Sequence, residues 1–226
     1  MSKKIGSFMI ILYIFMVCIM TYVNISIPRI VELSMIYILI TFVVLFETKT
    51  INSKDMVVIA VLATIGGVLR VPFAVIPGVQ PVTFICAVAG YTLGSINGFM
   101  VGAMCALISN FFLGQGPWTL WQMIAWGMCG VFFGALKPII NKKGIILFTI
   151  FCGVWGYIYG IILDQWYVIE FIRPITFKSV VTGIALSFPQ DTMHCIGNII
   201  FSITLGKNFI NILKRYNKRN EIVYLE

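Results

Sequence analysis

Long apolar runs separated by short polar connections account for almost the whole chain of 226 residues. A helix needs about 20 consecutive apolar residues to cross a bilayer, and eight segments approach that length. They are residues 7–27, 33–47, 56–71, 80–94, 97–113, 118–136, 145–164 and 179–206. Glycine and proline interrupt several of them, so the helix ends are the least exact part of this prediction. The pattern predicts an all-α membrane protein.

The composition leads to the same class of protein. Hydrophobic residues make up 60% of the chain, against roughly 45–50% in a soluble domain, and the mean hydropathy is +1.00. The first apolar run follows Lys3 and Lys4 and continues to about Ile27 without a small-residue cleavage site. We therefore interpret it as a retained helix and not as a signal peptide. The connections leave no room for a soluble catalytic domain.

The basic residues predict the orientation of the chain. With a cytoplasmic N-terminus, twelve of the 16 basic residues fall on inner segments, and the outer segments carry only Arg29, Arg70, Arg173 and Lys178. Because cytoplasmic loops are enriched in Lys and Arg, we expect both termini to be cytoplasmic. We expect the basic residues from 207 to 219 to lie against anionic lipid. No folded basic surface is available for nucleic acid, so no nucleic-acid partner is expected.

A polar linker at residues 47–55 divides the chain. We expect a transmembrane helical hairpin at 1–52, a helical core at 53–211 and a basic cytoplasmic tail at 212–226. The six cysteines all lie in apolar segments without CxxC spacing, so we interpret them as small hydrophobic residues. Neither a disulfide framework nor a metal site is expected.

The stretch from Asn110 to Gly127 combines a glycine-rich turn with an aromatic helix. Gly114 and Gly116 end one apolar segment, and Pro117 suits the first turn of the next. That helix carries its large side chains on one face at helical spacing, namely Trp118, Trp121, Gln122 and Trp126. Three indoles and an amide beside a turn at the membrane boundary favour a small-molecule site. The alternative is an interfacial aromatic belt combined with core packing.

The last apolar helix carries polar groups near its middle. Asp191, His194 and Asn198 are three and four residues apart and share one face. A charge inside the membrane costs roughly 2.5–3.5 kcal/mol, so such groups usually face a cavity or a partner. Three interpretations stay open: a structural pair of Asp191 with His194, contact with a ligand, and a proton relay.

Two segments near the outer surface are candidates to cover a ligand. Residues 70–81 contain three prolines and include Gln80, which predicts a semi-rigid flap. Residues 164–178 begin at Asp164 and mix aromatic with charged side chains. This second segment either closes over a ligand or anchors the chain at the interface.

Small residues cluster on the helix predicted at 56–70. Ala60, Ala63 and Gly67 give it a flat face, and small residues let helices approach closely in lipid. This face serves either packing within the chain or docking of another membrane subunit.

Enzyme motifs are missing from the sequence. It has no GxSxG, no Walker A motif and no HExxH, and its single histidine excludes bis-histidine haem ligation within the chain. We therefore expect no catalytic activity, no ATPase of its own and no cofactor.

Several motifs from about residue 55 to 207 resemble the substrate-binding (S) components of energy-coupling factor (ECF) vitamin transporters. They are the small-residue helix, the IPGVQP loop at 76–81, AGYTLGSINGF at 89–99, GQGPWTLWQMIAWG at 114–127 and DTMHCIGN at 191–198. The resemblance implies a six-helix core, here preceded by a two-helix N-terminal extension, in a prokaryotic plasma membrane. It implies that a vitamin binds near the outer face. It also implies a membrane T component and two ATP-binding-cassette (ABC) subunits as partners.

The resemblance also assigns roles to residues. It implies docking through Ala60, Ala63 and Gly67, and a substrate pocket built from Gln80, Asn110, Trp118, Trp121, Gln122, Trp126, Asp164, Asp191, His194 and Asn198. The GQGPW block is similar to the branch for cobalamin or another corrinoid. The alternatives are a proton-coupled secondary transporter that uses Asp191 and His194, and a purely structural subunit of a membrane complex.

Overall fold

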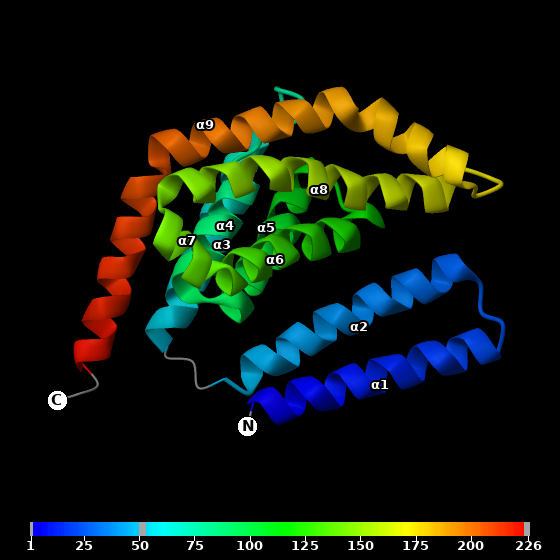
Figure 1. The fold of residues 1–226 in the computed structure, drawn as a ribbon, viewed down its shortest axis with the longest axis horizontal. Coiled ribbons are helices and arrows are strands. Elements are labelled where there is room, and N and C mark those ends of the chain that lie inside the picture. The colour runs from blue at the N-terminus through cyan, green and yellow to red at the C-terminus, as the bar shows by residue number, and fades with distance from the viewer. Residues whose placement is uncertain (1, 50–52, 224–226) are drawn as a thin grey trace. The chain divides into compact units, whose positions relative to one another are not determined.

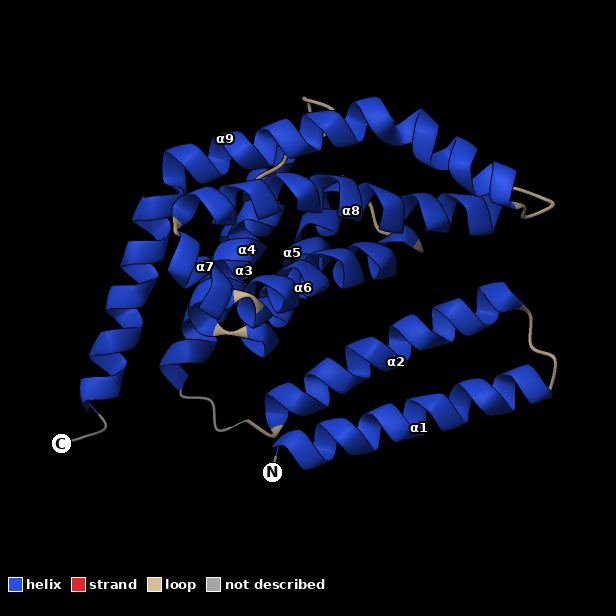
Figure 2. Ribbon diagram, viewed as in Figure 1, coloured by secondary structure: helices blue, strands red, loops and turns tan. Residues whose placement is uncertain are grey.

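A computed structural model describes residues 2–49 and 53–223, and in these residues all regular secondary structure is α-helical (Figures 1 and 2). The helices are α1 (Ser2–Tyr22), α2 (Ile27–Glu47), α3 (Ser53–Phe73), α4 (Val82–Leu93), α5 (Ser95–Leu113), α6 (Trp118–Ala135), α7 (Lys137–Lys143), α8 (Ile145–Phe171) and α9 (Phe177–Val223). Six of them are long and apolar enough to cross a membrane, namely α1, α2, α3, α5, α8 and α9. The pair α6 and α7, bent by 61°, is a possible seventh span. The predicted all-α membrane protein is confirmed.

The chain divides into two compact units between Val57 and Val58. In the N-terminal unit, α1 and α2 form a hairpin in which the Tyr37 hydroxyl donates to the carbonyl of Met9 at 2.7 Å. Only 11% of the spanning window of either helix is buried. Because most of the exposed side chains are apolar, lipid is the medium that suits this hairpin.

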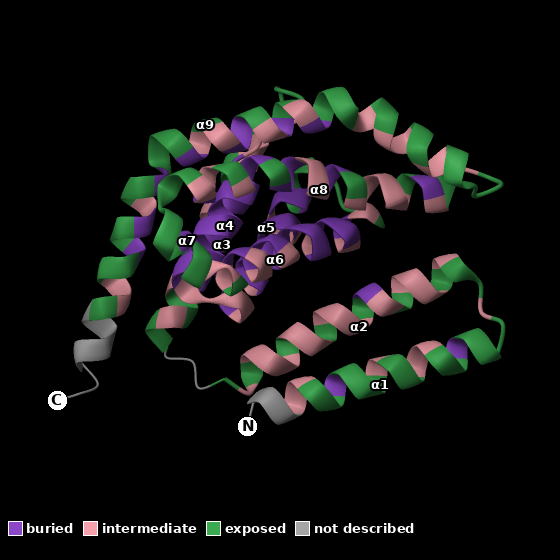
Figure 3. Ribbon diagram, viewed as in Figure 1, coloured by how far each residue is buried: buried purple, intermediate pink, exposed green. Residues whose placement is uncertain are grey.

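The centre of the second unit, which we call the core unit, is α4. Eleven of its twelve residues, Val82 to Thr92, are buried, and α5, α6, α8 and α9 pack around it (Figure 3). Twelve residues rise only about 18 Å, which is too short for a bilayer core of about 30 Å. The segment expected at 80–94 is therefore a helix enclosed by protein, not one of the six spans.

Glycines bring α4, α5 and α6 into backbone contact. A methyl group on Gly90 would collide with the backbone of Gly130, and one on Gly98 would lie 2.5 Å from the Cα of Gly90. Further along α5, a methyl group on Gly102 would collide with the backbone at Trp126. Close packing of this kind stabilises the association of helices in lipid, where burial of apolar side chains contributes little because lipid is itself apolar.

Three helices extend further than the sequence indicated. α3 continues to Phe73 because Pro72, in its last turn, sacrifices only one backbone bond. α8 runs on to Phe171, so the connection expected at 164–178 shortens to residues 172–176. α9 continues to Val223, beyond the boundary predicted at 211. Its end is held by Lys214, which bonds the Tyr91 hydroxyl at 3.1 Å, and by Asn217, which donates to the carbonyl of Thr92 at 3.0 Å.

We expect Gly90→Ala to destabilise the protein by about 1–3 kcal/mol, because the added methyl group forces α4 and α6 apart. Thermal unfolding in detergent measures the effect. Gly6→Ala is the matched control, since Gly6 lies in α1 with nothing within 4 Å of the added carbon. Equal melting temperatures of the two variants would contradict the close approach.

Candidate functional site

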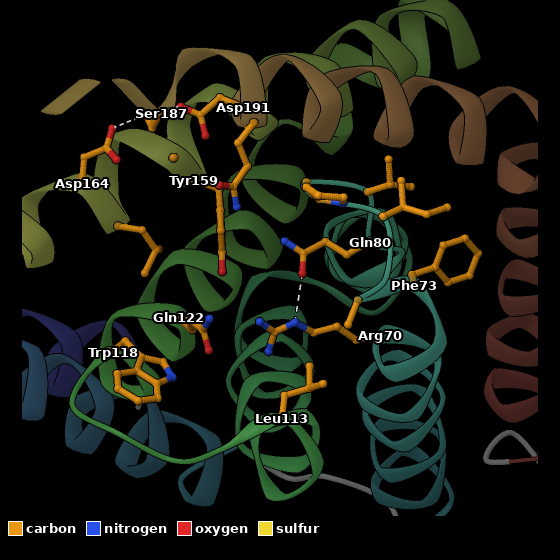
Figure 4. Close-up of a pocket in the computed structure, with 18 of the residues that line it drawn as sticks. Arg70, Phe73, Gln80, Leu113, Trp118, Gln122, Tyr159, Asp164, Ser187 and Asp191 are labelled. Atoms are coloured by element: carbon orange, nitrogen blue, oxygen red, sulfur yellow. Dashed lines mark hydrogen bonds between the residues drawn. The ribbon is translucent and has the colours of Figure 1, made fainter. Parts of the chain in front are cut away.

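One end of the core unit contains a cavity of about 480 Å³ (Figure 4). Its walls come from the C-terminal ends of α3, α5 and α8, the N-terminal ends of α6 and α9, and residues 74–80 of the connection before α4. Its polar lining is Arg70, Gln80, Gln122, Tyr159, Asp164, Ser187, Gln190 and Asp191, and its larger apolar lining includes Phe73, Leu113, Trp118, Leu163 and Trp166. An apolar pocket with a few convergent polar groups is typical of small-molecule sites.

Residues 74–80 close one side of the cavity through an unusual backbone conformation. Gly78 has φ of +80°, which side chains rarely tolerate, and its Cα faces the backbone of α9 at Gln190. A methyl group there would collide with the Gln190 carbonyl oxygen. The glycine of the IPGVQP loop therefore lets this connection lie directly against α9 at the cavity.

Arg70 lies on one wall, and its partners among the described residues are all uncharged. Its Nε donates to Gln80 Oε1 at 2.9 Å, and its Nη1 donates to Ser109 Oγ and to Asn110 Oδ1, each at 2.8 Å. The guanidinium also lies 4.9 Å from the ring centroid of Trp126. These contacts orient the cation and leave its charge without an anion, which favours an anionic or strongly hydrogen-bonding ligand.

Asn110 connects this wall to α6 from behind the cavity. Only 1% of the residue is exposed, and its Nδ2 donates to Thr119 Oγ1 at 2.8 Å and to Gln122 Oε1 at 2.7 Å. The backbone N–H of Gly116 also donates to Thr119 Oγ1 at 3.3 Å, and this hydrogen bond fixes the turn before α6. One buried amide thus positions both Arg70 and Gln122.

Two carboxylates occupy the opposite wall, where α8 meets α9. The hydroxyl of Ser187 lies 2.7 Å from Asp164 Oδ2 and 2.9 Å from Asp191 Oδ2. Gly160 of α8 makes room for this arrangement, because a methyl group there would collide with the carboxyl group of Asp191. Neither carboxylate has a cationic partner among the described residues.

An aromatic layer lies behind the cavity floor. His194 Nε2 is 2.8 Å from Thr83 Oγ1, which also accepts the indole N–H of Trp126 at 3.0 Å. Tyr159 stacks on Trp126 with ring centroids 4.7 Å apart, and its ring is 5.0 Å from that of His194. Tyr159 lines the cavity, whereas Trp126 and His194 lie beneath it.

The residues proposed from the sequence fall into three groups in the structure. Gln80, Trp118, Gln122, Asp164 and Asp191 line the cavity. Asn110, Trp126 and His194 form the layer that supports it. Trp121 and Asn198 are buried elsewhere, with Asn198 Nδ2 bonded to the carbonyl of Cys152 at 3.1 Å.

The sequence analysis missed Arg70, Tyr159 and Ser187 as lining residues. Arg70 was counted only as an outer charge, although an arginine inside an apolar helix is a signal of function in its own right. Tyr159 and Ser187 carried no signal, because tyrosine and serine are ordinary in membrane helices. The described residues contain no group of three or more His, Cys, Asp or Glu side chains placed to hold a metal ion.

The small residues of α3 divide between two faces. Ala63 is 1% exposed, and Gly67 packs against Ile108 of α5, so both belong to the core. Ala60 is exposed. Thr64, four residues later, is exposed on the same side of the helix.

The fold and the cavity define a multi-pass membrane protein with a polar site at one end of a helical bundle. A family model described as "ECF transporter, substrate-specific component" matches residues 54–213, and the chain belongs to this family. The resemblance seen in the sequence is thereby confirmed. α1 and α2 lie outside the matched range.

Curated relatives carry a name that states no ligand. A UPF0397 protein of Aliivibrio fischeri (strain MJ11) is 27% identical over 75% of this chain and 95% of its own length. A UPF0397 protein of Vibrio atlanticus (strain LGP32) is 28% identical over 75% of this chain and 94% of its own length. A UPF0397 protein of Aliivibrio salmonicida (strain LFI1238) is 31% identical over 42% of this chain and 54% of its own length. No solved structure matches the chain.

Membership of the family establishes the class of function. S components are substrate-binding subunits of the cell membrane that work with a T component and ATPases, and they are not enzymes. The chain is therefore a transport subunit.

We expect Thr83→Val to lower stability by about 1–3 kcal/mol, because the imidazole of His194 and the indole N–H of Trp126 then lose a buried partner. Thr204→Val is the control, since that exposed hydroxyl bonds only to its own helix, at the Ile200 carbonyl. Thermal unfolding in detergent distinguishes them. A Thr83→Val protein as stable as the control would exclude a structural role for this network.

Proposed function

We propose that the chain captures a vitamin or related micronutrient in the cavity between Arg70 and the Asp164–Asp191 pair, for import driven by the ATPases of its complex. The observation that carries the proposal is the cavity itself. A space of about 480 Å³ lies within the usual range of 300–1,000 Å³ for small-molecule sites. Polar side chains from four helices and from the connection before α4 converge on it, and the protein satisfies them only in part.

The charge distribution of the core unit supports an outward-facing cavity. α7 joins the end of α6 to the start of α8 and carries Lys137, Lys142 and Lys143. The cavity lies at the other ends of the same two helices. Since Lys and Arg concentrate on the cytoplasmic side, the α7 end faces the cytoplasm and the cavity faces outward. In this orientation the C-terminal end of α9 is cytoplasmic.

The size of the cavity bears on the choice of ligand. Trp118 and Trp166, with ring centroids 5.7 Å apart, form an aromatic wall that suits a flat ring. A ligand of ordinary vitamin size fits the cavity as it stands. A corrinoid, the candidate indicated by the GQGPW block, is much larger than this cavity.

The proton-relay alternative is less well supported, because no direct hydrogen bond joins its two groups among the described residues. Asp191 bonds Ser187, whereas His194 bonds Thr83, so the two side chains have separate partners. His194 is 2% exposed and does not line the cavity. A relay needs a chain of hydrogen-bonded groups, and the capture of a solute does not.

Docking on the T component is best served by the exposed face of α3. Ala60 and Thr64 are small and exposed there, with Val61 and Val68 beside them. Ala63 and Gly67 contribute indirectly, by seating α3 against α5. We include this face in the proposal as the contact with the partner subunit.

We expect Ala60→Trp to reduce co-purification with a co-expressed T component and its ATPases, because the indole prevents close approach of the partner helix. The control is Ile150→Trp, an equally bulky change on α8 at a side chain that is 52% exposed. Both variants should keep the melting temperature of the parent protein. Undiminished co-purification of Ala60→Trp would place the docking contact elsewhere.

A calorimetric screen of B vitamins, corrinoids and haem tests the binding proposal in the absence of ATP. We expect one class of these compounds to bind. Gln122→Ala, which removes a hydrogen-bonding group, and Trp118→Ala, which removes a ring contact, should each weaken binding by at least about 3-fold. Cys105→Ala, buried between α5 and α3, is the control and should leave the affinity unchanged. A screen without a ligand, or variants that bind like the parent, would reject the cavity as the substrate site.

A further inference from the structure

The cavity keeps opposite charges apart. Arg70 and the two carboxylates, Asp164 and Asp191, line the same space, yet they form no ion pair with one another (Figure 4). Figure 4 shows Arg70 on one side of the cavity and the carboxylates on the other, with Tyr159 between them. In surroundings of low polarity such groups attract strongly, so specific contacts must hold them apart.

The carboxylate side is short of hydrogen-bond donors. Ser187 has a single hydroxyl hydrogen, and carboxylate oxygens of two residues lie within bonding distance of it. Asp191 is only 7% exposed, and Ser187 is the only hydrogen-bond partner of either carboxylate in the described residues. The two carboxylates repel each other in this position, and a cation bound between them would remove the repulsion.

The guanidinium side has donors to spare. Arg70 uses Nε and Nη1 for its three bonds, and its Nη2 has no hydrogen-bond partner in the part of the chain that the structure describes. Gln80, Ser109 and Asn110 hold the group by three hydrogen bonds, so it cannot swing toward the carboxylates without losing these bonds. A further donor lies on α8, where the indole Nε1 of the lining residue Trp166 is buried and has no hydrogen-bond partner among the described residues.

We infer that the ligand carries groups of both signs: a carboxylate or phosphate that binds Arg70, and a protonated amine or cationic heterocycle that binds Asp164 and Asp191. The inference rests on the function proposed above and narrows its substrate class to small zwitterions. A ligand with a charge of one sign leaves the charged side chains of the other wall without a counter-charge in a poorly solvated site. A neutral ligand leaves the charged side chains of both walls without one.

Matched vitamin-like probes test this inference on the whole purified protein in detergent. Pyridoxamine 5′-phosphate and thiamine monophosphate carry both signs. Pyridoxamine and thiamine lack the phosphate, and riboflavin 5′-phosphate carries a phosphate without a cation. Riboflavin and other neutral vitamins complete the panel, with calorimetry and thermal shift as readouts. We expect the tightest binding from a probe with both signs, and about 10-fold or more weaker binding from its one-sign analogues.

Charge-removing variants then assign each sign to its wall. We expect Asp191→Asn to weaken a zwitterion at least about 10-fold and to change the binding of the anion-only probe little. Arg70→Gln should weaken the zwitterion similarly and change the binding of its cation-only analogue little. Asp164→Asn provides a second test on another helix if Arg70→Gln does not fold. Glu170→Gln and Lys178→Gln, exposed changes of the same charge outside the cavity, are the controls.

The outcomes separate this inference from the function on which it rests. Tightest binding by a neutral or one-sign ligand, weakened by Gln122→Ala, would overturn the zwitterion inference and leave the transport role intact. It would also be overturned if Asp191→Asn weakened the anion-only probe, and Arg70→Gln the cation-only analogue, as much as each variant weakens the zwitterion. Absence of binding by every probe and by the wider vitamin screen would count against the binding function itself.

Discussion

An arginine inside a membrane-spanning bundle must find its hydrogen-bond partners within the protein, because the bilayer core offers none. In this chain that requirement joins four segments at Arg70. Gln80 comes from the connection before α4, and Ser109 and Asn110 come from α5. Asn110 carries the network on to Thr119 and Gln122 of α6. The cavity therefore has a rigid wall whose polar groups are oriented before any ligand arrives, which lowers the entropic cost of binding.

Close packing and open space lie at opposite ends of the core unit. Where α4, α5 and α6 meet at Gly90, Gly98 and Gly130, their backbones touch and no side chain fits between them. The cavity is built at the other end of α5 and α6, around the GQGPW turn. Helix association in lipid depends on such backbone contact, so the glycine end supplies stability that the cavity end does not have to provide. The close packing at one end therefore allows the helical bundle to contain a polar cavity at the other.

The polar side chains in the membrane have different roles according to their partners. His194, Thr83 and Trp126 satisfy one another beneath the cavity and stabilise the bundle. Asp164, Asp191 and Arg70 are satisfied only in part, and these are the groups that face the open space. Buried polar groups normally have partners, so a set of incompletely paired charges around one cavity is the chemistry expected of a receptor for a polar solute. The family relationship supplies the rest: such a subunit captures the solute, and other subunits of the complex provide the energy of import.

The hydropathy of the sequence alone was enough to establish the all-α membrane class. The motifs of the sequence were enough to identify the family. Helical spacing also placed Trp118 and Gln122 on one face, and both line the cavity. The same spacing grouped Trp121 and Trp126 with them, although these two are buried in the packing. Periodicity defines the faces of one helix but not which neighbour covers each face. Ser187 brings together Asp164 of α8 and Asp191 of α9. Arg70 of α3 lines the same cavity but pairs with neither. These relations involve residues on different helices that are far apart in sequence. Only the packing of those helices decides such contacts, because their energy depends on distances that no local pattern contains.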